Sequence, residues 1–519
     1  MNFSTENEFL RNIKCTDSYT ESAAEYSLPD YLGDVRKILY TSAVARPAGK
    51  FAGGEDIEHS GIVEYEVVYL DAENNISSVE FTSDYDYAVK YCADKYKSAI
   101  SDTRVHNYVI RLVGPRKISA KVTLVGCVRI CERDSVSVSG TAFEEGRAVE
   151  ALTESVRIRR CGESGVIERE YAEMVCRLDG AIADEVSVVH SRVDVDAESV
   201  EAHDGYVGIK GKIKLCAVVK NGESPAYLSE KSVAFEESIP FGELDEEMRL
   251  FPSIAVVSRK AAVNPDENGC EVVLSGIVEF AVRQEGNSSL EVVRDAYLCD
   301  CNTENTYDNF GYTELVGAMS KRVVHQAEIA RSEIDAGDMR EIIFITATPK
   351  IESVTVEGCG VHIKGEMKYS GVASEVKDGG DMSYTMIKFS TSIDENVNLD
   401  CQNDEKMQFE TDAVVHDVDA TLDANKLYVS TSMDFTIILS ADKEVSILSS
   451  AQALDDEPAG SVGSCISVYY PTESDTLFSV AKRFHTTVAK LCDDNSLSVE
   501  TAATNSSEKL RGIKKLLIF

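Results

Sequence analysis

Apolar and polar residues alternate along most of residues 1–450. In residues 63–69, valine or tyrosine at every second position alternates with Glu64 and Glu66, and residues 213–217 show the same period. A period of two predicts strands that are buried on one face and wet on the other. Turn signals such as Asn221-Gly222 separate these runs. The pattern therefore predicts a mainly β protein built from antiparallel sandwiches.

The strand pattern recurs along the chain, which indicates internal repetition. Gly61, Gly211 and Gly365 stand in similar strand-like runs, 150 and then 154 residues apart. A second run repeats in step, with Gly126 and Gly276 again separated by 150 residues. We interpret these glycines as marks of a β-bulge or of a close backbone approach rather than of catalysis. The repeated segments also include a weaker third copy of the second run, at 427–435, and similar openings at 31–40, 179–189 and 338–345.

We therefore expect three tandem sandwich-like units and a separate C-terminal module. The predicted parts are an N-terminal segment at 1–30, repeats at 31–140, 179–300 and 338–448, a flexible linker at 449–465 and the module at 466–519. The stretches 167–175 and 323–330, between the repeats, fit either helices or strands that complete each sandwich. The linker prediction follows from the Asp, Glu, Pro, Gly and Ser content of that segment.

The C-terminal module changes from strand spacing to helical spacing. Residues 466–470 alternate as a short strand does, and the following residues place four apolar side chains on one helical face, namely Leu477, Val480, Ala481 and Phe484. Asp475 is placed to cap this helix. Thr487 is placed to cap a second helix whose inner face is Val488, Leu491 and Cys492. A strand at 514–518 completes the predicted order of strand, helix, helix, strand.

This module resembles the LysM domain. The resemblance rests on matching residues at matching spacing, namely Asp475-Thr476-Leu477, 481–484, 486–488, Leu491 and Asn495. It implies a βααβ fold with a shallow ligand groove between the loop before the first helix and the loop after the second. Carried onto this sequence, the groove residues are Glu473, Ser474, Asp475, Thr476 and Leu477 from the first loop, and Asn495, Ser496 and Leu497 from the second.

Two kinds of ligand are compatible with this resemblance. The family implies binding of peptidoglycan or of other N-acetylglucosamine oligomers. However, Ser474 replaces the loop glycine of the family, and Phe478 replaces its usual tryptophan in a chain that has no tryptophan. These departures favour a protein-docking face formed by Lys482, Arg483, Lys490 and exposed apolar side chains around Phe478. Core filling by Phe478 and an ordinary solvated helix face are the alternatives.

The combination of acidic β repeats with a C-terminal LysM resembles the SPOCS-domain proteins of endospore-forming bacteria. This resemblance implies a non-enzymatic scaffold for spore coat assembly in the mother cell, at the forespore surface. The LysM domain would then dock onto a coat morphogenetic protein, the ATP-hydrolysing basement protein of the coat. Peptidoglycan glycan is the alternative partner.

The composition limits which kinds of partner and which kinds of chemistry are expected of this chain. The chain has 89 acidic and 52 basic residues and a formal net charge of −37, which disfavours nucleic acid. It has no apolar run of about eighteen residues and no secretory signal pattern at its acidic start, so neither a transmembrane segment nor export is expected. No catalytic or metal-binding motif is present, and no cofactor is predicted. The fourteen cysteines are interpreted as small buried side chains, with later disulfide cross-linking as the alternative.

Overall fold

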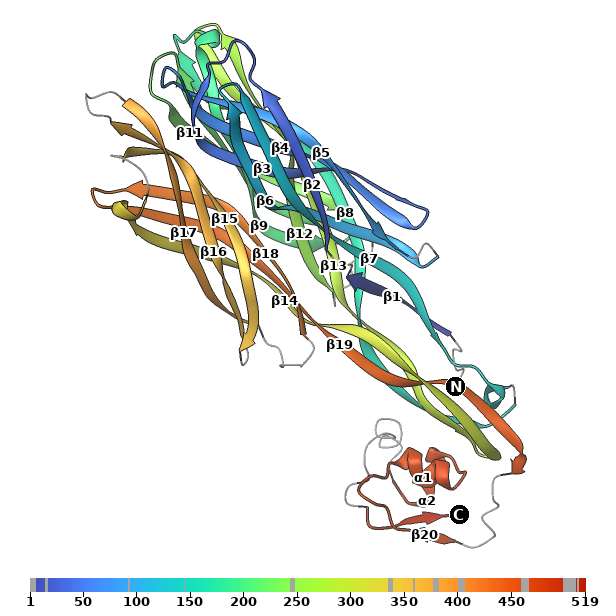
Figure 1. Cartoon of the computed structure of the whole chain (residues 1–519). Helices are drawn as coiled ribbons and strands as arrows, with labels where there is room; N and C mark the ends of the chain where they lie inside the picture. The colour runs from blue at the N-terminus through green and yellow to red at the C-terminus, as the bar shows by residue number, and fades with distance from the viewer. Residues whose placement is uncertain are drawn as a thin grey trace.

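The computed structural model is a mainly β molecule with a small helical module near its C-terminus (Figure 1). It describes residues 6–14, 17–91, 94–144, 146–242, 248–334, 339–357, 360–376, 382–399, 407–458, 466–497, 510 and 513–519. The predicted fold class is confirmed. Strands form the body, and the α-helices among the described residues lie between Leu477 and Asp494.

Three β-sandwiches with one common strand order form the body. In each, the second, third and fourth strands form one antiparallel sheet, and the first, sixth and fifth strands form the other. The first sandwich contains β2 (Ser18–Ser27), β3 (Val35–Gly53), β4 (Asp56–Asp71), β5 (Ile76–Lys90), β6 (Tyr96–Gly114) and β7 (Lys117–Ser137). The second contains β8 (Val149–Asp179), β9 (Val186–His203), β10 (Tyr206–Asn221), β11 (Tyr227–Pro240), β12 (Arg249–Asp266) and β13 (Gly269–Leu298). The third contains β14 (Cys301–Ala330), β15 (Met339–Glu357), β16 (Gly360–Val376), β17 (Met382–Asn398), β18 (Met407–Leu422) and β19 (Lys426–Pro458).

The repeated sequence segments fall on equivalent strands. The openings of the units lie on β3, β9 and β15, the first glycine run on β4, β10 and β16, and the second run on β7, β13 and β19. Strand β1 (Glu6–Lys14) is an addition to the first sandwich. Strands β1 and β2 pair with two different segments of β7. In the other two sandwiches one long strand does the same, since β8 pairs with β13 and β14 pairs with β19.

The predicted boundaries differ from the structure where the first strand of each sandwich lies. Strand β2 falls in the predicted N-terminal segment 1–30, and β8 and β14 begin well before the predicted starts at 179 and 338. The stretches 167–175 and 323–330, for which the sequence left helix and strand as alternatives, are therefore strand, within β8 and β14. These strands alternate half-buried and exposed positions with few fully buried ones, so their sequence shows little apolar periodicity. The linker prediction is wrong for 449–458, which extends β19; residues 459–465 lie outside the described part.

The glycines of the first repeated run mark both a bulge and a close backbone approach, as predicted, whereas a Cβ on Gly126 of the second run would meet the Tyr87 ring. A Cβ on Gly211 would lie 1.9 Å from the backbone oxygen of Asp196 on β9, and the register of the β9–β10 pair shifts between Lys210 and Gly211. Equivalent Cβ atoms on Gly61 and Gly365 would lie 2.3 Å and 2.4 Å from backbone oxygens. Only glycine lets the neighbouring strand come this close.

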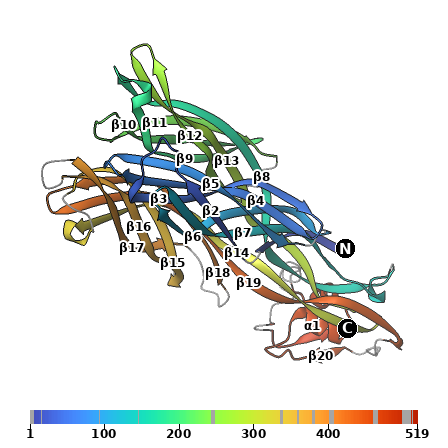
Figure 2. The same cartoon turned by 45° about the horizontal axis from the view of Figure 1, so that its top comes forward.

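The sandwiches pack side by side, as Figures 1 and 2 show. One apolar cluster draws side chains from all three, namely Leu39, Tyr40, Val68, Leu70, Ile76, Val189, Val218, Ala226, Ile343, Phe344, Val372 and Tyr384. At its edge the His190 ring stacks on Phe344 at 4.1 Å, and its Nδ1 lies 2.7 Å from a carboxylate oxygen of Glu66. The three repeats thus share a core in addition to their own.

A buried charge cluster also joins the three sandwiches. Arg129 belongs to the first, Arg159, Arg283 and Glu285 to the second, and Glu410 to the third. The Arg159 guanidinium contacts Glu285 and lies 2.9 Å from Glu410, while Arg283 and Arg129 lie 2.7 Å and 3.2 Å from Glu285. Burial alone would raise the pKa of Glu285, but the three arginines hold it below its usual value. Glu410 pairs with Arg129 of the first sandwich and Arg159 of the second, so its charge keeps these partners only while the three sandwiches stay together.

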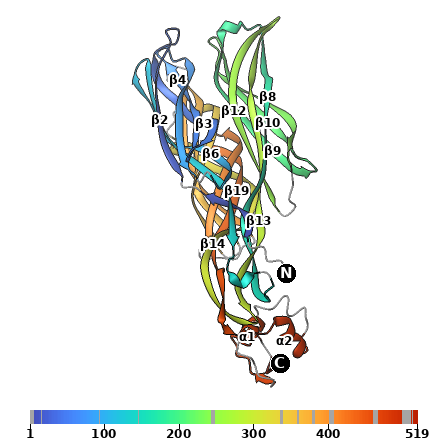
Figure 3. The same cartoon turned by 90° about the vertical axis from the view of Figure 1, so that its right-hand side faces the viewer.

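The strands β7, β8, β13, β14 and β19 continue past the sandwiches as a narrow stem that leads to the C-terminal module (Figure 3). The stem has its own apolar side chains, drawn from the ends of all five strands, among them Val136, Ile158, Val292, Leu298, Cys301 and Leu448. Within the described ranges, short 3₁₀ turns occur at η1 (Thr141–Phe143), η2 (Ala183–Glu185) and η3 (Arg331–Glu333). The first of these, η1, packs on the stem through the buried Ala142.

Candidate binding site in the C-terminal module

The module folds in the predicted order of strand, helix, helix, strand. Its elements are β20 (Ser467–Tyr469), α1 (Leu477–Arg483), α2 (Val488–Asp494) and β21 (Leu516–Ile518), with β20 and β21 antiparallel. The predicted inner faces of both helices are buried, except that Phe484 is half-buried. Thr487 caps α2 as predicted, by accepting a hydrogen bond of 3.0 Å from the Lys490 N–H.

The cap of α1 is Thr476, so the prediction of Asp475 is wrong by one residue. Thr476 and Ser479 form a reciprocal capping box, in which each side-chain oxygen accepts the backbone N–H of the other residue. A capping box satisfies two backbone donors that would otherwise lack partners at the helix start. Because Thr476 fills this role, the Asp475 carboxylate is left for the preceding loop.

Asp475 braces the loop between β20 and α1. Its buried carboxylate accepts hydrogen bonds of 2.7 Å from the Thr472 N–H and from the Tyr469 hydroxyl. These bonds hold the pKa of Asp475 below its usual value, with the Thr472 N–H as the main cause. The carboxylate is therefore occupied inside the loop, and it fixes the loop's shape instead of facing a ligand.

Of the five residues predicted in the first loop, Glu473 and Ser474 are exposed, while Thr476 is half-buried and Leu477 is buried. The backbone of this loop is partly engaged as well, because the Asp475 carbonyl accepts a bond of 2.9 Å from the Leu510 N–H. The side chains of Glu473 and Ser474 are thus the accessible part of the predicted first-loop set.

The second predicted loop also contains both residues that are engaged within the module and residues that are accessible. The Asn495 amide donates to the carbonyls of Leu491 and Leu517 at 2.8 Å each, and its oxygen accepts from the Leu517 N–H at 2.6 Å. Asn495 therefore ties α2 to β21 and has no group left for a ligand. Ser496 is exposed, with a positive φ of 57°, and Leu497 is half-buried in the module core. Most of the serine- and threonine-rich segment after Leu497 lies outside the described residues.

The predicted docking face around Phe478 is covered by the body. Phe478 is 4% exposed and packs edge-on against Tyr297 of β13, with ring centroids 5.2 Å apart. The Lys482 ammonium group lies 2.6 Å from the Asp295 carboxylate. The prediction of exposed apolar side chains around Phe478 is therefore wrong, and core filling is what the structure shows. Arg483 remains exposed, with its guanidinium over the Tyr469 ring at 5.3 Å.

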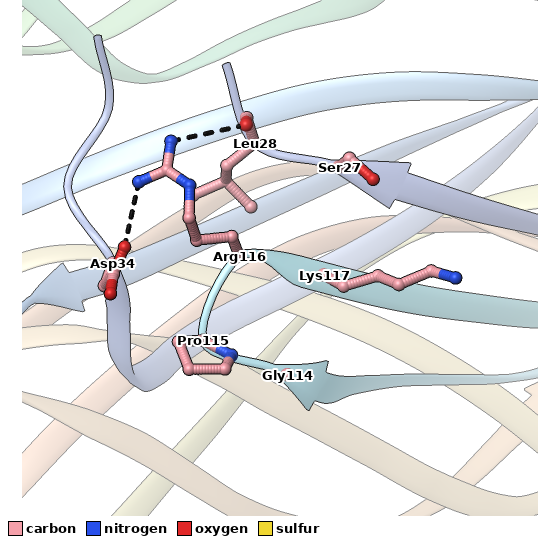
Figure 4. Close-up of a pocket in the computed structure, with 7 residues that line it drawn as sticks. All are labelled: Ser27, Leu28, Asp34, Gly114, Pro115, Arg116 and Lys117. Carbon is pink, nitrogen blue, oxygen red and sulfur yellow. Dashed lines mark hydrogen bonds and ion pairs between the residues drawn. The ribbon is translucent and has the colours of Figure 1, made fainter. Parts of the chain in front are cut away.

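A second candidate feature is a hollow at the end of the first sandwich, lined by Ser27, Leu28, Asp34, Gly114, Pro115, Arg116 and Lys117 (Figure 4). The Arg116 guanidinium donates to the carbonyls of Leu32 at 2.9 Å and Pro29 at 2.7 Å, and pairs with Asp34 at 2.8 Å. These bonds fasten the turn before β3 to the β6–β7 turn, so Arg116 acts as a structural clamp.

The described residues contain no group of three or more His, Cys, Asp or Glu side chains arranged to hold a metal ion. Within the same residues, no helix has the length and apolar character that a bilayer crossing requires. Cys216, Cys270, Cys301 and Cys492 are buried free thiols.

The family comparison identifies this module. Residues 472–501 match the model of the LysM domain, so the chain contains a LysM domain in this segment. The match begins at Thr472 and covers the braced loop, both helices and the second loop. No curated protein and no solved structure matched the chain.

The contacts that sequence reasoning missed are those of Tyr469, Thr472 and Tyr297. Tyr469 and Thr472 stand close to Asp475 in the sequence, and a polar loop residue near a strand end is a signal that they cap one another. Tyr297 lies more than 150 residues before the module. Nothing in the local pattern could have associated it with Phe478.

Proposed function

We propose that this protein is a non-enzymatic scaffold that presents a LysM domain at the end of a rigid β body. The LysM domain would bind peptidoglycan or a related N-acetylglucosamine oligomer through its two loops. One observation carries this proposal: the α1 face packs on the body, whereas Glu473, Ser474 and Ser496 of the loops remain exposed. The part of the module left open for a ligand is the part that LysM domains use for glycan.

The braced first loop supports this proposal. A polar loop binds a sugar with little entropic cost when its shape is fixed beforehand. The Asp475 carboxylate supplies this rigidity through its bonds to Thr472 and Tyr469. Ser474 adds a side chain where the family has glycine, so we expect weaker sugar binding than a glycine would allow.

A second candidate is an adaptor role in spore coat assembly, in which the LysM domain docks onto an ATP-hydrolysing coat protein in the mother cell. The support for it is the outer face of the β20–β21 sheet. This face exposes 59% of Ile466, 49% of Val468, 70% of Tyr470 and 51% of Phe519. A group of exposed apolar side chains of this kind, on and directly beside two paired strands, is more typical of a protein contact than of a sugar groove. The coat assignment itself rests on the resemblance to SPOCS-domain proteins.

Calorimetric titration of the full chain with soluble chitin oligomers tests the first candidate. We expect micromolar binding that Ser474→Trp weakens at least tenfold, because the indole would block the first loop. Val468→Glu, on the outer face of the β20–β21 sheet and outside both loops, is the matched control and should leave sugar binding unchanged. Absence of sugar binding would contradict the glycan proposal.

The adaptor candidate predicts the reverse pattern. In that case the purified coat protein would be retained by the full chain, Val468→Glu would abolish retention, and Ser474→Trp would have a small effect. Retention that neither substitution changes would argue against both surfaces.

A further inference from the structure

The end of β13 contacts the LysM domain through a group of side chains that the proposed ligand sites do not use. Tyr297 is 2% exposed, packs on Phe478 and donates its hydroxyl to the Thr486 carbonyl at 2.7 Å. The Nδ1–H of His485 donates to the Leu298 carbonyl at 3.3 Å. Leu152 of β8 and Cys299 also pack against the module core. The contact thus combines an aromatic anchor with hydrogen bonds at its edge.

Asp295 is held in place by residues of the body as well as by Lys482. Its Oδ1 accepts hydrogen bonds of 2.7 Å from the Asn305 amide and 2.8 Å from the Tyr307 hydroxyl, both on β14. The register of the β8–β13 pair shifts between Val293 and Asp295. A shift of this kind re-aims the side chains that follow it. Asp295 therefore presents its carboxylate in a fixed direction, towards Lys482.

The electrostatics of the two parts favour the contact. Residues 466–519 contain seven basic and six acidic residues, so the net negative charge of the chain lies entirely on the residues before them. A nearly neutral module with exposed lysines is attracted to an acidic body, and a specific pair then fixes the register of the contact.

The chain connection makes even a weak contact effective. Only residues 459–465 separate the end of β19 from Ile466. Seven residues span at most about 25 Å, which keeps the module close to the stem. At the resulting millimolar effective concentration, a contact too weak to hold two separate molecules can remain mostly formed.

We propose that residues Asp295–Leu298 form an intramolecular docking site for the LysM domain. We call this site the latch, because it holds the α1 face on the stem. The latch gives the ligand loops a fixed direction relative to the body. It also excludes any partner that needs Phe478 or Lys482, because such a partner must first displace β13. This inference does not depend on which ligand the loops bind.

Tryptophan fluorescence of the full chain tests the latch. Because the chain has no tryptophan, Phe478→Trp introduces a single reporter at the contact. In this background Lys482→Glu places a like charge opposite Asp295. We expect the emission to shift to longer wavelength and acrylamide quenching to rise at least twofold. Adding Asp295→Lys to Lys482→Glu restores the pair with reversed sign and should reverse both changes.

Lys490→Glu is the matched control, since it makes the same charge change on an exposed lysine of the same module, whose ammonium group donates to a backbone oxygen of Phe519 at 3.3 Å. Equal spectral changes for Lys482→Glu and Lys490→Glu, or no change for either, would overturn the latch. A second measurement avoids the reporter: in the otherwise unchanged chain, Tyr297→Ala should speed amide hydrogen exchange in 477–486 at least tenfold while the sandwich strands keep their protection. Unchanged exchange in 477–486 would also overturn it.

Discussion

The junctions between the sandwiches and the junction between the stem and the LysM domain are built from different kinds of contact. Between sandwiches, the paired side chains of Arg159 and Glu410 are 5% and 12% exposed, and all three units contribute residues to one apolar core. Between stem and module, the ion pair of Lys482 and Asp295 is 34% and 23% exposed, and Tyr297 is the principal anchor. Buried charges lose their compensation when units part, whereas half-exposed charges are readily hydrated. We therefore expect the sandwiches to unfold as one cooperative body and the module to detach from it more easily.

Of the substitutions that test this comparison, Glu285→Ala should lower the free energy of unfolding the most. It would leave Arg159, Arg283 and Arg129 without their shared carboxylate, and removal of one partner from a buried ion pair costs about 3–5 kcal/mol. Denaturant unfolding followed by far-UV circular dichroism should therefore show a large loss of stability in one transition. Glu271→Ala, on the same strand but outside the cluster, is the control and should change little. Separate transitions for the three sandwiches would contradict a single cooperative body.

Gly211→Ala should have a smaller effect that starts within one sandwich. The added methyl group would meet the backbone oxygen of Asp196, which a side-chain rotation cannot move away. Overpacking of this kind costs about 1–3 kcal/mol. In Gly311→Ala the new Cβ meets no atom within 4 Å, so this strand substitution should be neutral or slightly stabilising. The measurement is the melting temperature of each variant. If the sandwiches are coupled, Gly211→Ala lowers the transition of the whole body.

The smallest predicted effect concerns pH at the junction of the second and third sandwiches. His416 donates to Asp434 at 2.9 Å and to the Val195 carbonyl at 3.2 Å, and Arg322 pairs with both Asp434 and Asp196. Burial would lower the pKa of His416, but its bond to Asp434 and the nearby carboxylates raise it. Burial would raise the pKa of Asp434, but His416 and Arg322 hold it well below its usual value.

The two shifts make stability depend on pH in opposite directions. The stability due to His416 is complete below its unfolded pKa of about 6.5 and is lost as pH rises through its raised folded pKa. The stability due to Asp434 is complete above its unfolded pKa of about 3.9 and is lost as pH falls through its lowered folded pKa. Both contributions are therefore complete between about pH 4 and 6.5. His416→Gln should flatten the alkaline side of a stability profile, and His203→Gln, an exposed control, should leave it as it is.

How far the sequence predicts this structure depends on how local the controlling contact is. The repeated glycines, the alternation on β4 and β10, and the two helix faces of the LysM domain follow from spacing within one element, and they were predicted correctly. The strands β8 and β14 were left open or misplaced, since they show little apolar periodicity. Asp475 was assigned to the wrong role because Thr476, the next residue, can also cap a helix and Tyr469 competes for the carboxylate.

The sequence by itself determined the strand and helix periods, the threefold repetition and the presence of a LysM domain, because each depends on residue spacing along a single segment. Only the tertiary structure decided that the repeats share a core, that Arg129, Arg159, Glu285 and Glu410 meet, and that Tyr297 and Asp295 cover the α1 face. These contacts join residues from different repeats, or from the second repeat and the LysM domain. Their formation depends on how whole sheets pack, which no local pattern encodes.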